Sequence, residues 1–292
     1  MTGNGESTRY YLPAPSHWPV LGCAGLFVLF VGAAHWLHDA SSGPYLFAAG
    51  VILVGVMLIG WFRRVIEENQ SGFYDVAEGA SFRSGMAWMI FSEVAFFAGF
   101  FAALFFVRLW AVPELGGEDY PLTNLMLWPD FQAEWPLLEN PDNRKYLGAH
   151  AVSDPWSIPA LNTLILLSSG ATITWAHWGL MRDKRRVLVV GLIVTVALGV
   201  LFLTLQGNEY YDAYTKDGLS LNAGIYGSTF FLLTGFHGIH VTIGTIMLMV
   251  ILARSIAGHF TPARHFGFQG VAWYWHFVDV VWMFLFVFVY WL

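Results

Sequence analysis

Seven long apolar stretches follow one another along the chain, and shorter polar segments separate them. A transmembrane helix needs about 20 predominantly apolar residues, and each stretch comes close to that length or exceeds it. The pattern therefore predicts an all-α, polytopic membrane protein with seven transmembrane helices. The predicted helices are Val20–His38, Pro44–Phe62, Ser84–Val107, Ser157–Met181, Val187–Gln206, Leu219–Ala253 and Phe266–Leu292.

The polar segments differ in length and composition. Residues 67–83 carry both signs of charge, whereas residues 110–156 form a long, acidic and proline-rich outer loop. We do not expect this loop to form regular structure. The sixth apolar stretch is longer than an upright helix needs, so we expect it to tilt, to project from the membrane or to begin as a loop.

Composition supports a membrane protein. Of the 292 residues, 57% are hydrophobic and only 12% are charged, too few charges to solvate the surface of a soluble domain of this size. Cys23 is the only cysteine, which excludes a disulfide framework and a thiolate metal cluster. Residues 1–19 do not resemble a cleavable signal, so we expect the first apolar stretch to remain as an anchor.

The distribution of Lys and Arg orients the predicted helices. With the N-terminus in and the C-terminus out, ten of the fourteen basic residues face the cytoplasm. The outer side then holds twelve of the twenty acidic residues. Such a face favours the approach of a basic soluble partner by electrostatic steering. The same charges also suit solvated loops that keep the chain from inserting in reverse.

Glu93 is the only formal charge in the predicted helix Ser84–Val107. A charged carboxylate at the centre of a bilayer costs roughly 2.5–3.5 kcal/mol on insertion scales, so we expect Glu93 to be mostly neutral. Two roles remain open for it. It is either a protonated acid hydrogen-bonded to a neighbouring helix, or a proton-linked or partner-facing group.

Helical spacing divides this stretch into two faces. One face is a stripe of small residues, which lets membrane helices approach closely. Glu93 lies on the bulky face, so we expect its carboxyl to point toward bulky side chains, lipid or another chain. The small stripe contains Ala95, Ala98, Gly99, Ala102 and Ala103, and the bulky face contains Phe96, Phe97, Phe100, Phe101 and Leu104.

Four histidines of the later predicted helices are candidate haem or metal ligands: His177, His237, His240 and His276. A haem or metal site needs ligands that converge at one depth, and nothing in this spacing demands convergence. We interpret these histidines as hydrogen-bonded interior or interface residues, and we predict no metal site.

Asp279 is the only charge of the last predicted helix. Trp275 and His276 precede it by four and three residues, so they offer it an indole and an imidazole donor. This spacing favours a structural role. A proton relay through Glu93 and Asp279 together would instead make the chain a proton-coupled carrier, although such sites usually lie at broken helices.

The motifs of soluble enzymes are absent, including the nucleophile elbow, the phosphate-binding loop and the dinucleotide fingerprint. Basic residues stand beside aromatic ones at the predicted membrane edges, at Arg63, Arg64 and Arg254 through His259. Cations at this depth suit anionic lipid headgroups. Ordinary orientation anchors explain them nearly as well.

Several motifs resemble the cytochrome c oxidase subunit III family, in the same order and over nearly the whole chain apart from the outer loop. The last helix, VAWYWHFVDVVWMFLFVFVYW at Val271–Trp291, and YGSTFFLLTGFHGIHVTIGT at Tyr226–Thr245 are long enough to be highly specific. The other matches are YYLPAPSHWP at Tyr10–Pro19, SEVAFF at Ser92–Phe97 and PALNTLILLSSGATITWAHWGLM at Pro159–Met181.

The resemblance implies a subunit of a haem–copper terminal oxidase that has no catalytic residue and binds no haem or copper itself. The cofactors belong to partner subunits I and II, and this subunit is thought to steady the catalytic subunit and its proton-uptake entrance while O2 is reduced to water. The basic soluble partner would be cytochrome c.

In that family two helices splay from a five-helix bundle, and phospholipid occupies the cleft. The resemblance therefore divides this chain into four segments. These are a cytoplasmic N-terminal segment, 1–19, a two-helix arm, 20–66, a cytoplasmic connection, 67–83, and a five-helix bundle, 84–292, that includes the outer loop.

Single residues match the family by position. Glu93 matches its carbodiimide-reactive intramembrane acid, and Arg254 and His259 match residues that hold a lipid phosphate near the inner surface. Trp61 and Glu68 match others on the lipid cleft. We add Arg63, at the same membrane edge, to the expected lipid-binding residues.

The chain also departs from the family pattern. Arg64 stands where a carboxylate is common and Glu67 where an arginine is common, so charge is exchanged. The pair Tyr74–Asp75 replaces a histidine–threonine pair, and Gln269 replaces a glutamate. These exchanges put the phosphate contacts at the end of the second helix in doubt, and those near Arg254 less so.

The leading hypothesis is a non-redox oxidase subunit, in a bacterial cytoplasmic membrane in preference to the mitochondrial inner membrane. One alternative is the equivalent subunit of a quinol oxidase. That subunit normally lacks the first two helices, which Val20–Phe62 supplies here. The proton-coupled carrier is an alternative from another class.

Overall fold

The computed structural model describes residue 11 and residues 14–74, 76–118 and 121–292. In this part of the chain seven helices are long and apolar enough to cross a membrane, and no strand occurs. The predicted all-α, seven-helix class is confirmed. The long helices are α1 (Trp18–Leu37), α2 (Gly43–Gln70), α3 (Val76–Phe106), α6 (Ile158–Met181), α7 (Arg185–Thr215), α8 (Gly224–Ile256) and α9 (Phe266–Leu285).

Shorter helical segments extend or follow these helices. The π-helical turn η1 (Val107–Ala111) and α4 (Val112–Leu115) continue α3, and η2 (Phe286–Trp291) continues α9. α5 (Pro121–Leu127) lies in the outer loop. The prediction that residues 110–156 lack regular structure was therefore wrong for the first part of that loop.

Several helices extend past their apolar stretches. α2 continues from the predicted end at Phe62 to Gln70, because ion pairs at i,i+4 stabilise its polar last turns. Nε of Arg63 lies 3.0 Å from Oε1 of Glu67, and the pair Arg64–Glu68 has the same geometry at 2.9 Å. α8 begins only at Gly224, so the long sixth stretch begins as a loop, one of the three outcomes expected.

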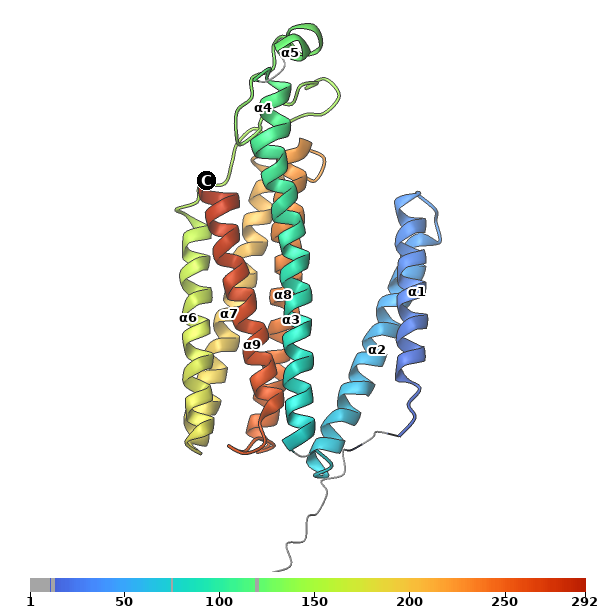
Figure 1. The fold of residues 1–292 in the computed structure, drawn as a ribbon, viewed down its shortest axis with the longest axis vertical. Helices are drawn as coiled ribbons and strands as arrows, with labels where there is room; N and C mark the ends of the chain where they lie inside the picture. The colour runs from blue at the N-terminus through green and yellow to red at the C-terminus, as the bar shows by residue number, and fades with distance from the viewer. Residues whose placement is uncertain (1–10, 12–13, 75, 119–120) are drawn as a thin grey trace, which may run out of the picture. The chain divides into compact units, whose positions relative to one another are not determined.

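The chain divides into two compact units, Met1–Phe82 and Arg83–Leu292. In the first unit α1 and α2 lie side by side along their length (Figure 1). Gly32 faces the backbone of Phe47, and a Cβ at Gly32 would overlap it. Such close backbone approach between membrane helices requires residues without a side chain.

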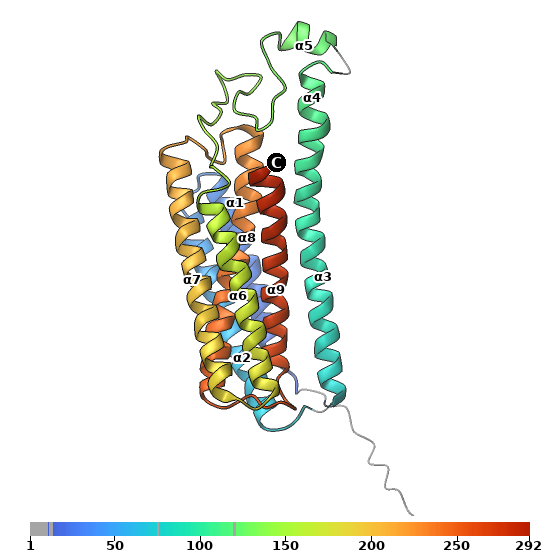
Figure 2. The ribbon, with the colours of Figure 1, turned by 90° about the vertical axis from the view of Figure 1, so that its left-hand side faces the viewer.

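In the second unit α6, α7, α8 and α9 form a bundle in which α9 contacts both α6 and α8 (Figure 2). The largest side chains of α9 fill the centre of this bundle: Trp275 and Trp282 are at most 1% exposed. Each indole N–H donates a hydrogen bond to a hydroxyl of α6, Trp275 to Ser169 and Trp282 to Thr163, both at 2.9 Å.

α3 contacts α8 and α9 through aromatic rings. The ring of Phe97 lies 5.1 Å from that of His240 and 6.1 Å from that of Phe277, between centroids. Farther along, Phe105 meets Phe288 at 5.2 Å. Because rings rather than small residues fill this contact, the helix backbones stay well separated.

Two glycines of α8 allow the packing to be tested within one helix. A Cβ at Gly244 would lie 2.9 Å from the ring of Trp275, whereas a Cβ at Gly238 would meet nothing within 4 Å. We expect Gly244→Ala to lower the stability of the chain by about 1–3 kcal/mol through overpacking. Gly238→Ala should stay within about 1 kcal/mol of the wild type, on the stabilising side, because alanine is the better helix former. Thermal unfolding in mild detergent measures both, and equal melting temperatures would contradict the packing described for Gly244.

Candidate functional site

The predicted intramembrane acid, Glu93, has a partner on another helix of the same chain. Its Oε2 lies 3.1 Å from Nε2 of His240, on α8. Both side chains are largely buried, and Phe97 and Tyr274 lie against the imidazole. Of the two roles left open by the sequence, hydrogen bonding to a neighbouring helix is the one with a visible partner.

The hydrogen bonds of His240 fix how many protons the pair holds. Nδ1 lies 2.6 Å from the carbonyl oxygen of Phe236, and because a carbonyl only accepts, Nδ1 must carry a hydrogen. Nε2 then either accepts a hydrogen from a neutral Glu93 or donates one to its carboxylate. In both cases one proton lies between the two groups and the pair has no net charge. Such a pair avoids placing an isolated charge in the bilayer.

The two faces of α3 do not lie as the sequence predicted. Phe97 and Leu104, on the face of Glu93, are buried against the bundle. The small stripe from Ala95 to Ala103 is exposed, and a Cβ at Gly99 would meet nothing within 4 Å. The prediction that the stripe makes the tight contact is therefore wrong within the described chain, because large rings bridge α3 to its neighbours.

Asp279 faces α6. Its Oδ2 lies 3.7 Å from Nδ1 of His276, and Nε2 of His276 lies 3.2 Å from the hydroxyl of Thr174. The indole of Trp275, predicted as a second donor, instead bonds Ser169. Asp279 is buried, with its Oδ1 unpartnered. Glu93 and Asp279 thus have separate partners, and the structure does not bring them together.

His237 is buried beside Trp282, with 5.1 Å between ring centroids. Its Nε2 donates to the carbonyl oxygen of Val278 at 3.2 Å. His177 lies farther along the bundle, near His265, at 5.5 Å between centroids. Among the described residues, no three His, Cys, Asp or Glu side chains form a group that could hold a metal ion.

A buried polar network near the other end of α7 escaped the sequence reasoning. Glu209 is only 4% exposed, and Gln206 donates to it at 3.2 Å. Asn162 donates to Gln206, and the hydroxyl of Tyr290 lies 3.4 Å from the Gln206 amide. The predicted fifth helix ends at Gln206, which places Glu209 among the twelve acids of the outer side. Gln206, three residues before the acid, was the one signal of this network that helical spacing offered.

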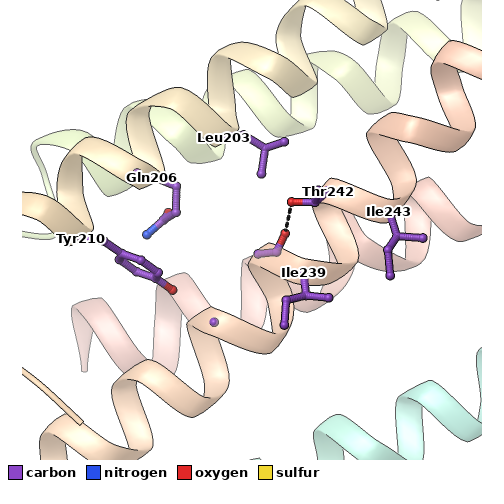
Figure 3. Close-up of a pocket in the computed structure, with 9 residues that line it drawn as sticks. Leu203, Gln206, Tyr210, Ile239, Thr242 and Ile243 are labelled. Carbon is purple, nitrogen blue, oxygen red and sulfur yellow. Dashed lines mark hydrogen bonds between the residues drawn. The ribbon is translucent and has the colours of Figure 1, made fainter. Parts of the chain in front are cut away.

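Beside this network an apolar groove of about 340 Å³ runs between α7 and α8 (Figure 3). Gln206 and Tyr210 contribute its polar side, and Leu203, Ile239 and Ile243 its apolar one. The hydroxyl of Thr242 is not free to bind there as a donor, because it donates to the carbonyl oxygen of Gly238.

Arg254 lies in the last turn of α8 and is half-buried. Its guanidinium lies over the ring of Phe260, 4.5 Å from the centroid, and its Nε has no partner. The backbone N–H of His259 bonds the carbonyl oxygen of Arg254 at 3.0 Å, so the two predicted lipid ligands are adjacent. A stacked guanidinium without a carboxylate partner suits a phosphate oxygen.

The end of α2 presents a different arrangement. Glu68 accepts hydrogen bonds from both Arg64, at 2.9 Å, and Tyr74, at 2.7 Å. Burial and this hydrogen bond hold the pKa of the Tyr74 phenol above its usual value, so it remains a donor. Glu68 therefore positions its neighbours, and the exposed Arg63 and Trp61 are left as the groups open to lipid.

Three further sequence observations concern the connections. Arg83 donates to Gln269 at 3.0 Å, so the amide that replaces the family's glutamate still binds a cation. Asp75 lies outside the described residues, as do Arg9 and most of the first residues of the predicted N-terminal segment, 1–19.

Comparison with known proteins agrees with the motifs. The sequence profile of cytochrome c oxidase subunit III matches residues 8–292. Cytochrome c oxidase subunit 3 of Equus caballus is 40% identical over 287 residues, covering 98% of each chain. The protein of the same name from Arabidopsis thaliana is 41% identical over 289 residues, and that from Squalus acanthias is 42% identical over 287, both with 98% coverage of each chain. The chain belongs to the cytochrome c oxidase subunit III family.

Proposed function

We propose that this chain is a non-redox subunit of a haem–copper terminal oxidase. It stabilises the catalytic subunit, with oxidase subunits I and II as its partners, binds structural phospholipid and supports proton uptake during the reduction of O2 to water. Family membership makes it part of an oxidoreductase complex and an integral membrane protein. In this proposal residues 20–66 act as the lipid-binding arm, and residues 84–292 as the bundle that packs on the catalytic subunit.

One observation carries the non-redox part: both ring nitrogens of His240 and of His276 are engaged with groups of this chain. His240 bonds Phe236 and Glu93, and His276 contacts Thr174 and Asp279. His237 bonds Val278 through Nε2, and its Nδ1 is buried without a partner. A haem or copper ligand needs a free ring nitrogen directed at the metal. This pattern supports the view that haem and copper are bound by partner subunits.

Glu93 belongs to a largely buried acid–imidazole pair that has no net charge. It shares one proton with His240, and both side chains keep some exposure at the surface of the bundle. A group that can hold or release a proton at a packing surface is suited to support proton uptake by a neighbouring subunit. Glu93 and Asp279 have separate partners, which disfavours the proton-coupled carrier.

Other parts of the hypothesis stay predictions. α1 and α2 favour a cytochrome c oxidase over a quinol oxidase, whose equivalent subunit normally lacks them. The steering of cytochrome c by an acidic outer face, the N-in and C-out orientation and the bacterial membrane rest on the sequence.

Co-purification tests the proposal as a whole. When the tagged chain is purified in mild detergent, haem absorbance and copper should travel with it at a fixed ratio. A chain that purifies alone and moves protons across liposome membranes would instead identify the carrier.

Substitution of Glu93 tests its charge state. We expect Glu93→Gln to co-purify with haem as the wild type does, because a neutral amide can still bond His240. Glu93→Leu should weaken assembly or stability by about 1–3 kcal/mol, because it leaves a buried imidazole nitrogen unpaired. Haem per tagged chain and thermal unfolding measure both effects. Loss of assembly in Glu93→Gln would show that the complex needs a charged carboxylate.

The proposed role of Arg254 in lipid binding is tested by counting the phospholipid that co-purifies with the protein. Arg254→Ala should lower the phospholipid that co-purifies by about one molecule per chain, since a phosphate loses its guanidinium partner. Arg264→Ala is the matched control, because it removes an exposed arginine from the same connection. Mass spectrometry of extracted lipid gives the count. Equal lipid in both variants would remove Arg254 from the proposed site.

A further inference from the structure

Two adjacent basic residues, Arg144 and Lys145, lie at one pocket on a side of the protein whose loops are mostly acidic. The pocket has a volume of about 450 Å³. It lies between residues 144–150 of the long loop and residues 218–222, which join α7 to α8. This is the end of the bundle at which α6 begins (Figure 1). We call it the loop-end pocket.

Hydrogen bonds hold the long-loop side of this pocket in shape. Asp142 accepts from the backbone N–H of Lys145 at 3.2 Å and from that of Tyr146 at 2.9 Å. Asn140 donates to the carbonyl oxygen of Tyr146 at 3.0 Å. The bend that presents the two basic side chains is therefore fixed by its own sequence.

A third basic side chain, His150, closes the pocket. Its backbone N–H donates to the carbonyl oxygen of Asp217 at 2.7 Å, which ties the long loop to the α7–α8 connection. The imidazole lies over Gly218, where a Cβ would come within 2.9 Å of its Cδ2. Gly218 also has a φ of +65°, a conformation that other residues rarely adopt. Glycine at position 218 therefore allows the positive φ of the turn and leaves room for the imidazole of His150.

The charges of the pocket are not neutralised within the described part of the chain. Neither the Arg144 guanidinium nor the Lys145 ammonium forms an ion pair there, and the ammonium lies over the ring of Tyr146, 5.3 Å from its centroid. The nearest acid in sequence, Asp142, uses its Oδ1 to accept from the Lys145 backbone. By contrast, Lys216 on the same side pairs with Asp212 at 2.9 Å.

We propose that the loop-end pocket binds a phosphate group. Arg144, Lys145 and His150 supply the cationic or imidazole donors, and Ser220 and Asn222 line the opposite wall with a hydroxyl and an amide. Several donors around one hollow match the tetrahedral oxygens of phosphate, and Arg is well suited to bidentate contact with it. The proposal does not depend on the proposed oxidase function.

Two sources supply the same chemistry. One is a phospholipid headgroup, for which the exposed Leu147 and Tyr146 at the rim offer apolar contact. The other is a phosphate in solution. The volume exceeds that of a single phosphate ion and leaves room for the group attached to it.

The test compares the wild type with an Arg144→Ala/Lys145→Ala double variant, as the full-length chain in whichever assembly it purifies. Equilibrium dialysis of lipid-depleted protein against labelled inorganic phosphate measures the soluble source. Mass spectrometry of lipid retained through detergent exchange measures the headgroup. We expect the double variant to bind phosphate about tenfold more weakly, or to lose about one phospholipid per chain. A difference between wild type and double variant in either assay supports the phosphate site. The assay that shows the difference identifies whether the phosphate comes from solution or from a phospholipid.

Lys216→Ala is the control, because it removes a cation of the same side that is already paired. It should match the wild type in both assays. Both basic residues are exposed, so the double variant should keep its thermal stability. Equal phosphate and lipid binding in wild type and double variant would overturn the proposal. So would a zero-length crosslink from Lys145 to a carboxylate of a neighbouring subunit, which would assign the pocket to a protein contact.

Discussion

Hydrocarbon offers no hydrogen-bond partner, so polar groups carried into the membrane must find one within the protein, on their own helix or on a neighbouring one. α9 shows how this constraint orders the bundle. Two of its three tryptophans, Trp275 and Trp282, fill the centre of the bundle and donate their N–H groups to hydroxyls of α6. Without a hydrophobic force between helices in lipid, such matched packing and bonding are what hold them in register.

The acid–imidazole pairs follow from the same constraint. Glu93 and Asp279 each face a histidine whose other ring nitrogen is already used, by the carbonyl of Phe236 and by Thr174. Each pair can therefore be uncharged as a unit. They differ in closeness, with a hydrogen bond of 3.1 Å for Glu93 and a separation of 3.7 Å for Asp279. Only the first is a direct hydrogen bond, and it alone joins two helices.

Apolar length was enough to predict the seven helices, because that length is set by the membrane. It could not predict their ends. The charged turns of α2 are helical through pairs such as Arg64–Glu68, and α7 continues past Gln206 to Thr215. This extension buries Glu209, which the predicted helix end at Gln206 left in an outer loop. Helix propensity and ion pairs decide these turns, and hydropathy does not report them.

Contacts between residues far apart in the sequence could not be predicted from it either. The sequence shows that Glu93 shares a face with phenylalanines, and the structure confirms that grouping. The sequence does not show that His240, 147 residues away, is the hydrogen-bond partner of Glu93, whereas the structure does. The small stripe near Gly99 predicts a close approach of helices, yet within the described chain the contact of α3 is made by rings such as Phe97. Spacing defines the faces of a helix, and the neighbours decide which face is covered.

The bare backbone at Gly170 has an evolutionary consequence. A Cβ there would overlap Oδ2 of Asp279, so the carboxyl occupies the space that a larger residue would need. The two positions are thus not free to vary separately. A lineage that acquires alanine at position 170 must move or replace the carboxyl at position 279, so the cost of either change depends on whether the other has already occurred.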